Sequence, residues 1–187
     1  MKKEELIIAT ALKLFVDNGF HGTATSKIAS ESGVANGTLF NYFPSKEILI
    51  VSIYHDIIKK MDDHIIRSIS SNSVSKSSLH SIFAATLHWN LQNSIQFRYI
   101  QQFNNSPYVK SAFSKTVSQE DHPLYVLIKN GIDLILLKPM PIDFIYSLFM
   151  AQINGLYHYM VMHNLNFDDS KELVDETFEL LWKTVKE

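Results

Sequence analysis

Apolar residues recur every three or four positions along most of the chain, and the period-two alternation of a half-buried β-strand is sustained nowhere. The first apolar stripe predicts a helix from about Lys3 to Asn18, and the Asn18-Gly19 pair supplies a stop signal. The apolar members of this stripe are Leu6, Ile7, Ala11, Leu14 and Phe15. The pattern therefore predicts an all-α protein.

Serine, proline and glycine set the expected boundaries of the other helices. Ser45 is a suitable N-cap, and Pro107 and Pro123 suit first-turn positions. Four of the six glycines fall within the first 37 residues, so tight turns concentrate there and long helices follow. Beyond this compact head, helices are expected at about 45–70, 77–93, 94–105, 107–119, 123–137, 139–163 and 168–186.

Residues 25–44, TSKIASESGVANGTLFNYFP, have the spacing of a helix-turn-helix. Ala29 must be small where the second helix crosses, Gly33 can take a left-handed turn conformation, and Ile28, Val34 and Leu39 hold the two helices together. The residues left on or near the outward face of the second helix are Asn36, Gly37, Thr38, Phe40, Asn41 and Tyr42. Such a face can enter a DNA major groove, although short helices joined by glycine also occur without DNA binding, and Tyr42 alternatively packs in the core.

The segment GFHGTATSKIASESGVANGTLFNYFPSKEIL and the helix before it resemble the DNA-binding domain of the TetR family of transcriptional regulators. The shared pattern is a Gly-aromatic pair, a Thr-rich helix start, Ile-Ala, Gly-Val, Gly-Thr-Leu, an aromatic-Phe pair and Ser-Lys-Glu. The resemblance covers about residues 3–50. It implies a DNA-binding domain at 1–46, with the helix-turn-helix at about 24–43, and a helical ligand-binding and dimerisation domain at 47–187.

The resemblance also implies which residues touch DNA. The matching positions are Thr25, Ser26, Asn36, Gly37, Thr38, Asn41, Tyr42 and Lys46. Two positions depart from the family pattern, because Phe40 replaces the usual tyrosine and Ala24 replaces a usual Ser or Thr. The loss of that phenolic hydroxyl leaves more of the phosphate contact to Tyr42 and Lys46, and Phe40 can instead meet a thymine methyl group.

Charge adds little support for DNA binding. The whole chain carries a formal charge of −2, and residues 1–46 hold five lysines against four acidic residues, a formal charge of +1. There is no cysteine, and the N-terminus does not read as a signal peptide, so a cytoplasmic location is expected. The uncharged stretch 144–167 contains too many amides and histidines for a bilayer and is interpreted as a buried interface helix, with no membrane partner.

The second half offers a candidate effector site and a candidate dimer interface. Residues 77–109 contain one charged side chain, Arg98, amid many aromatics, in the region where TetR-like proteins form an inducer pocket, although most of these aromatics suit a plain core. Few charges favour a small neutral or lipophilic effector. The pocket candidates are Trp89, Asn90, Arg98, Gln101, Phe103, Asn154 and His158.

TetR-like proteins build a four-helix dimer interface from the last two helices, and both of these helices carry apolar faces here. Ala151 and Gly155 are four residues apart, which permits close approach of another helix. The expected homodimer interface comprises Phe144, Leu148, Ala151, Gly155, Met162, Phe178, Leu181 and Val185.

The sequence gives no support for catalysis. No His-Glu-x-x-His motif, glycine-rich phosphate loop or nucleophile elbow occurs, and no metal site or cofactor is expected. The leading interpretation is a sequence-specific transcriptional regulator, most simply a repressor that releases a palindromic operator when an effector binds. The alternatives are a DNA-binding protein of the same fold with a structural or division-related role and no inducer, and, more remotely, a helical-bundle metalloenzyme.

Overall fold

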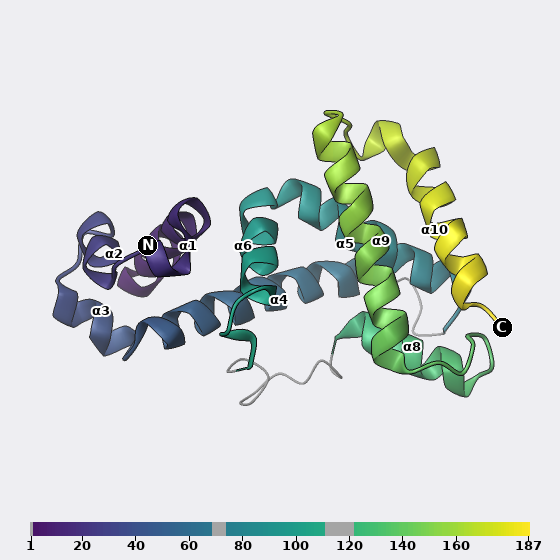
Figure 1. Ribbon diagram of the computed structural model, residues 1–187, viewed down its shortest axis with the longest axis horizontal. Helices are drawn as coiled ribbons and strands as arrows, with labels where there is room; N and C mark the ends of the chain where they lie inside the picture. The colour runs from purple at the N-terminus through teal and green to yellow at the C-terminus, as the bar shows by residue number, and fades with distance from the viewer. Residues whose placement is uncertain (1, 69–73, 111–121) are drawn as a thin grey trace. The chain divides into compact units, whose positions relative to one another are not determined.

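The structure is a computed structural model that describes residues 2–68, 74–110 and 122–187 (Figure 1). Within these ranges every regular element is a helix, and the only β-type pairing is an isolated bridge between Leu137 and Lys186. The all-α prediction is confirmed. The elements are α1 (Lys3–Gly22), α2 (Thr25–Glu31), α3 (Asn36–Tyr42), α4 (Lys46–Ser68), α5 (Lys76–Gln92), α6 (Ser94–Asn104), α8 (Pro123–Asp133), α9 (Ile142–Met162), a 3-10 turn (Asp168–Ser170) and α10 (Lys171–Val185).

The described residues divide into two compact units. The N-terminal unit comprises the described parts of 1–59 and 93–117, and the C-terminal unit comprises those of 60–92 and 118–187. Helix α4 contributes to both units. These units are defined by packing, and the sequence-based division between residues 46 and 47 remains a prediction. The helix expected at 107–119 lies mostly outside the described residues.

The N-terminal unit is built around an aromatic cluster that a kink in α1 makes possible. Gly19 has φ +76° and ψ 162°, a backbone region that only glycine enters without strain. The chain therefore turns at the predicted stop, and the ring of Phe20 folds back to 5.4 Å from that of Phe15. Tyr99 of α6 packs 5.4 Å from Phe20, and its buried hydroxyl donates to the Ile50 carbonyl at 2.9 Å. This cluster fixes α1 and α6 against the start of α4.

The C-terminal unit has its core where α5 packs against α8, α9 and α10 (Figure 1). Phe178 of α10 lies at its centre, with its ring 5.6 Å from Phe83 of α5 and 6.4 Å from Phe149 of α9. All three rings are at most 1% exposed. An aromatic core of this kind stabilises the unit mainly through burial of apolar surface.

Helix ends in the C-terminal unit follow the predicted signals, with one exception. Pro123 lies in the first turn of α8 as predicted. Helix α8 was predicted to run to Leu137 but ends at Asp133, because the chain reverses there and Leu137 packs over Gly131, where an added Cβ would lie 2.8 Å from Leu137 Cδ1. The reversal places Ile135 at φ +57°, a strained conformation for a β-branched residue that costs about 1–3 kcal/mol.

The uncharged stretch 144–167 falls mainly in α9. Among the described residues, no helix is both long enough and apolar enough to cross a membrane.

Candidate nucleic-acid interface

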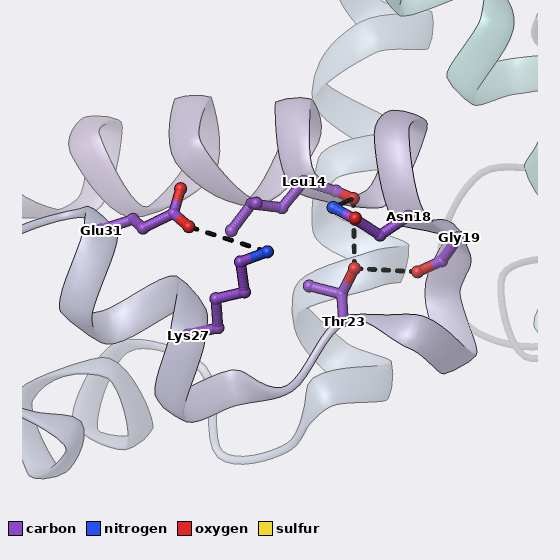
Figure 2. A network of polar contacts seen from close by, with 6 residues as sticks. All are labelled: Leu14, Asn18, Gly19, Thr23, Lys27 and Glu31. Atoms are coloured by element: carbon purple, nitrogen blue, oxygen red, sulfur yellow. Dashed lines mark hydrogen bonds and ion pairs between the residues drawn. The ribbon is translucent and has the colours of Figure 1, made fainter.

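A buried threonine ties the start of α2 to the end of α1. The Thr23 hydroxyl lies 2.9 Å from the Gly19 carbonyl and 3.1 Å from the Leu14 carbonyl, as Figure 2 shows. The amide of Asn18 donates to the same Leu14 carbonyl at 3.1 Å. Because Thr23 is fully buried, these bonds satisfy its hydroxyl and hold the chain after the kink against the C-terminal part of α1.

The turn between α2 and α3 has the geometry that the sequence predicted. Gly33 adopts φ +68°, and the Val34 amide reaches back to the Ala29 carbonyl at 3.0 Å. Ile28, Ala29 and Leu39 are at most 2% exposed, so they form the contact between α2 and α3. The two helices are therefore a packed helix-turn-helix, and the remaining faces of α3 point away from this contact.

The polar face of α3 is open to solvent. Asn36, Gly37 and Asn41 are exposed, and so are the two aromatic side chains Phe40 and Tyr42, at 41% and 44%. The core-packing alternative for Tyr42 does not fit this exposure. The other predicted DNA-contact residues lie within the same unit: Ser26 is exposed, and Thr25, Thr38 and Lys46 are partly exposed. Whether these residues touch DNA stays a prediction.

Gly37 has no structural reason to be glycine within this subunit. It lies inside α3 without a positive φ, and an added Cβ would meet no atom within 4 Å. Glycine in a helix destabilises it by about 0.5–1 kcal/mol relative to alanine. The space above Gly37 therefore suits a second body that approaches the helix backbone closely.

The charge near this face is modest. Lys27 forms an ion pair with Glu31 along α2 at 3.9 Å (Figure 2), and both side chains are about half exposed. This pair offsets one of the five lysines of residues 1–46. Ser45 caps α4 by accepting the Ile48 amide at 3.1 Å, as predicted, which fixes Lys46 at the first position of that helix.

The predicted effector residues divide between the two units. Arg98, Gln101 and Phe103 belong to the N-terminal unit, where Phe103 is buried and stacks on Tyr54 at 4.1 Å. Trp89, Asn90, Asn154 and His158 belong to the C-terminal unit, and His158 is exposed there. Two of these predicted effector residues, Asn90 and Asn154, have buried polar atoms. Both amide atoms of Asn90 and the Oδ1 atom of Asn154 are buried without a hydrogen-bond partner.

Three further residues of the C-terminal unit carry buried polar atoms that the sequence pattern did not predict. Thr86 lies one turn before Asn90 on α5, and its buried hydroxyl is also unpartnered. His122 and Asp62 face each other, with 3.4 Å between Nε2 and Oδ1, and neither atom makes a hydrogen bond. Such orphaned polar atoms are costly, at about 1–3 kcal/mol each, and require an explanation.

His122 is a neutral imidazole near neutral pH, so it does not form an ion pair with Asp62. Burial lowers the pKa of His122 to about 4, and burial together with the neighbouring Asp63 charge raises the pKa of Asp62 to about 7. His122 Nδ1 accepts the Leu124 amide at 3.2 Å, so the proton of the neutral ring lies on Nε2 and points toward Asp62. Nothing in the sequence pattern marks this pair, because the two residues are 60 positions apart.

A stripe of α9 stays exposed on the C-terminal unit. Phe144 is 52% exposed and Met162 75%, Leu148 is partly exposed, and Ala151 and Gly155 are exposed. An added Cβ on Gly155 would meet no atom within 4 Å. We call these five residues the α9 face. They repeat at helical spacing, so they lie on one side of the helix.

The α10 residues predicted for the same interface are placed differently. Phe178, Leu181 and Val185 are at most 2% exposed, because they pack inside the C-terminal unit's own core. They are not available to a partner in this arrangement. The exposed apolar side chain of α10 is Leu180, at 61%. The apolar face of α10 was correctly read from the sequence, but the subunit itself covers most of it.

Among the described residues, no group of three or more His, Cys, Asp or Glu side chains is placed to hold a metal ion.

Two family comparisons cover nearly the whole chain. Residues 7–53 match the family described as "Bacterial regulatory proteins, tetR family", and residues 54–187 match "Tetracyclin repressor-like, C-terminal domain".

Among curated relatives, the HTH-type transcriptional regulator YuxN of Bacillus subtilis is 47% identical over 58 residues, which is 29% of this chain and 20% of that protein. The fatty acid metabolism regulator protein of the same organism is 36% identical over 63 residues, 32% of each chain. The matched segments thus span only a fifth to a third of these relatives.

Among solved structures, a Shewanella sp. PV-4 protein assigned to the tetR family of transcription regulators superposes with a TM-score of 0.90 and 31% identity over 100% of both chains. A TetR family transcription regulator from Marinobacter aquaeolei VT8 shares the fold, with a TM-score of 0.82 and 20% identity over 99% of this chain and 96% of that one.

Proposed function

Since this chain belongs to the TetR family of transcriptional regulators, we propose that it binds a palindromic DNA operator as a homodimer and releases it when a small molecule binds the C-terminal unit. The observation that carries the DNA-binding part is the open face of α3, with Asn36, Asn41 and a helix glycine that nothing in the subunit requires. Regulators of this family are DNA-binding proteins rather than enzymes, and we propose no catalytic activity.

The side chains of this face divide into two roles. Asn41 and Asn36 present amides that can pair bidentately with adenine in the major groove, so they read sequence. Lys46 carries a fixed charge at the first turn of α4, and Tyr42 carries a hydroxyl, so both suit phosphate contacts. Thr25 and Ser26 at the start of α2, with Thr38, add hydroxyls for the same purpose.

Substitution of Lys46 and of Asn41 should separate these roles. Lys46→Ala should weaken binding to all DNA sequences similarly and flatten the salt dependence by about one unit per subunit, because one counterion fewer is released. Asn41→Ala should cost roughly 1–3 kcal/mol on the selected operator and little on random DNA. Titrations of the selected operator and of random DNA at several salt concentrations measure both effects. If Lys46→Ala changed sequence preference while Asn41→Ala weakened every sequence equally, the assignment would be reversed.

We propose the α9 face, with Leu180 of α10, as the surface that a second copy covers. A contiguous exposed apolar face is unusual on a stable monomer, and a two-fold axis pairs one surface with itself. In this proposal Leu180 takes the interface role that the sequence pattern predicted for Phe178, Leu181 and Val185. Two such subunits present two α3 helices, which explains why a palindrome with half-sites about one helical turn apart is expected.

We propose that the effector occupies the C-terminal unit, which holds the orphaned polar atoms of Thr86, Asn90 and Asn154 and also the His122–Asp62 pair. Helix α5 packs against both α8 and α9 there. These atoms supply amide, hydroxyl and imidazole hydrogen bonds but no positive charge, so an anion would lack compensation. The effector class is therefore a neutral molecule that carries hydrogen-bonding groups along with apolar surface.

Asn90→Leu tests this site, because it should raise thermal stability and abolish the release of DNA by the effector. Removal of the orphaned amide should raise the thermal midpoint of the ligand-free protein by a few degrees, because each 1 kcal/mol shifts it by about 2–4 °C at this size. The variant should no longer release operator with effectors that release it from the unmodified protein. The exposed Asn130→Leu should change neither property. Release by polyanions alone in a compound screen would contradict the proposed class, and a protein that never releases DNA would favour the structural alternative.

A further inference from the structure

Phe40 is an apolar side chain on the open face of α3, whose other exposed side chains carry polar groups. Its ring is 41% exposed, and it follows Gly37 by one turn. At about 100° per residue, Phe40 and Gly37 lie roughly 60° apart around the helix, so the ring stands next to bare backbone. An added Cβ on Gly37 would meet nothing within 4 Å, so no side chain, that of Phe40 included, fills the space at Gly37.

The other exposed aromatic of α3 lies elsewhere on the helix. Tyr42 is two positions from Phe40 and therefore about 200° away, on the opposite flank. Its hydroxyl can donate to a phosphate, which Phe40 cannot do. The two rings therefore suit different parts of a DNA duplex.

A phenylalanine ring has no hydrogen-bond donor or acceptor, so it cannot read the polar edges of bases. The major groove presents one prominent apolar group, the C5-methyl of thymine. We propose that Phe40 reads one thymine in each half-site of the operator through contact with this methyl group. This inference rests on the proposed DNA-binding function of α3 and assigns Phe40 as a specificity-determining residue.

The test begins with selection of bound DNA by the full-length protein and then replaces each thymine of the selected site with deoxyuridine. That replacement removes the methyl group and keeps the base pair. One thymine per half-site should be sensitive, with binding weakened about fourfold for one methyl lost and about 15-fold when both half-sites are changed. Replacement at other thymines should have little effect.

Variants then assign the methyl contact to a residue. Phe40→Ala should bind the thymine and deoxyuridine sites equally, whereas Phe40→Leu should keep part of the preference. Tyr42→Phe is the matched control and should keep the full preference. Because Phe40 is 41% exposed, Phe40→Ala should remain folded, and thermal unfolding measured beside binding separates a lost contact from a lost fold.

The outcomes are distinguishable. Failure to enrich any DNA would overturn the proposed function and this inference with it. Enrichment of a site in which no thymine methyl matters, or in which Phe40→Ala keeps the full thymine preference, would overturn the inference alone. A preference that disappears in Phe40→Ala and persists in Tyr42→Phe supports it.

Discussion

Gly155→Leu should convert a dimer into a folded monomer and reduce operator binding by two or more orders of magnitude. Within the subunit the new side chain enters open space, because an added Cβ on Gly155 meets no atom within 4 Å. The replacement of a helix glycine should even stabilise α9 by about 0.5–1 kcal/mol. In a dimer that uses the α9 face, however, leucine would separate the packed helices.

The loss of DNA binding follows from the loss of pairing. Two linked recognition helices bind a palindrome with an avidity that exceeds single-site affinity by roughly 10²–10⁴. Sedimentation or light scattering at micromolar concentration, with circular dichroism as the folding check, measures the first effect, and operator titration measures the second. The control is Val161→Leu, an exposed α9 residue about 120° around the helix from Gly155, which should remain dimeric.

Gly155→Ala provides a second measurement if the leucine variant aggregates. It should raise the thermal stability of the subunit and weaken the dimer. If both Gly155 variants remained dimeric at the concentrations where the unmodified protein is dimeric, the α9 face would not be the interface.

Gly37→Ala should weaken operator binding by roughly 5- to 150-fold per subunit while it makes the N-terminal unit more stable. The helix should gain at most about 0.5–1 kcal/mol, which is the value for a helix interior, because Gly37 lies in the first turn of α3. The new methyl group would occupy space that the DNA fills in the complex, and overpacking of that kind costs about 1–3 kcal/mol. Thermal unfolding measures the gain in stability, and operator titration measures the loss of affinity.

Gly33→Ala is the matched control because Gly33 lies in the same motif and also has no neighbour within 4 Å of an added Cβ. Gly33 has φ +68°, so alanine there is strained and should lower the thermal midpoint. Opposite signs at the two glycines would show that one serves the fold and the other serves binding. Unchanged operator affinity in Gly37→Ala would mean that DNA does not approach this part of α3.

The all-α class, most helix boundaries and the helix-turn-helix could be predicted from the sequence, because each depends on local features. Apolar periodicity fixes which side of a helix is buried, and Ser45, Pro123 and Gly33 act through the backbone next to them. The resemblance to the TetR family rests on the same kind of short-range pattern. The α3 face was also readable, since a helix of seven residues with Leu39 inward leaves few choices for the rest.

Which apolar face packs within the subunit and which stays exposed depends on contacts that form only in the folded chain. Phe178, Leu181 and Val185 share a pattern with the α9 residues, yet they are buried in the C-terminal unit, Phe178 against Phe83 of α5 and Phe149 of α9, while Phe144 and Gly155 remain exposed. The His122–Asp62 pair could not be predicted from the sequence either, because its two residues meet only after folding and burial then shifts their pKa values. Apolar periodicity predicts which side chains of a helix are buried. It does not predict which residues bury them, because those contacts join segments distant in the sequence.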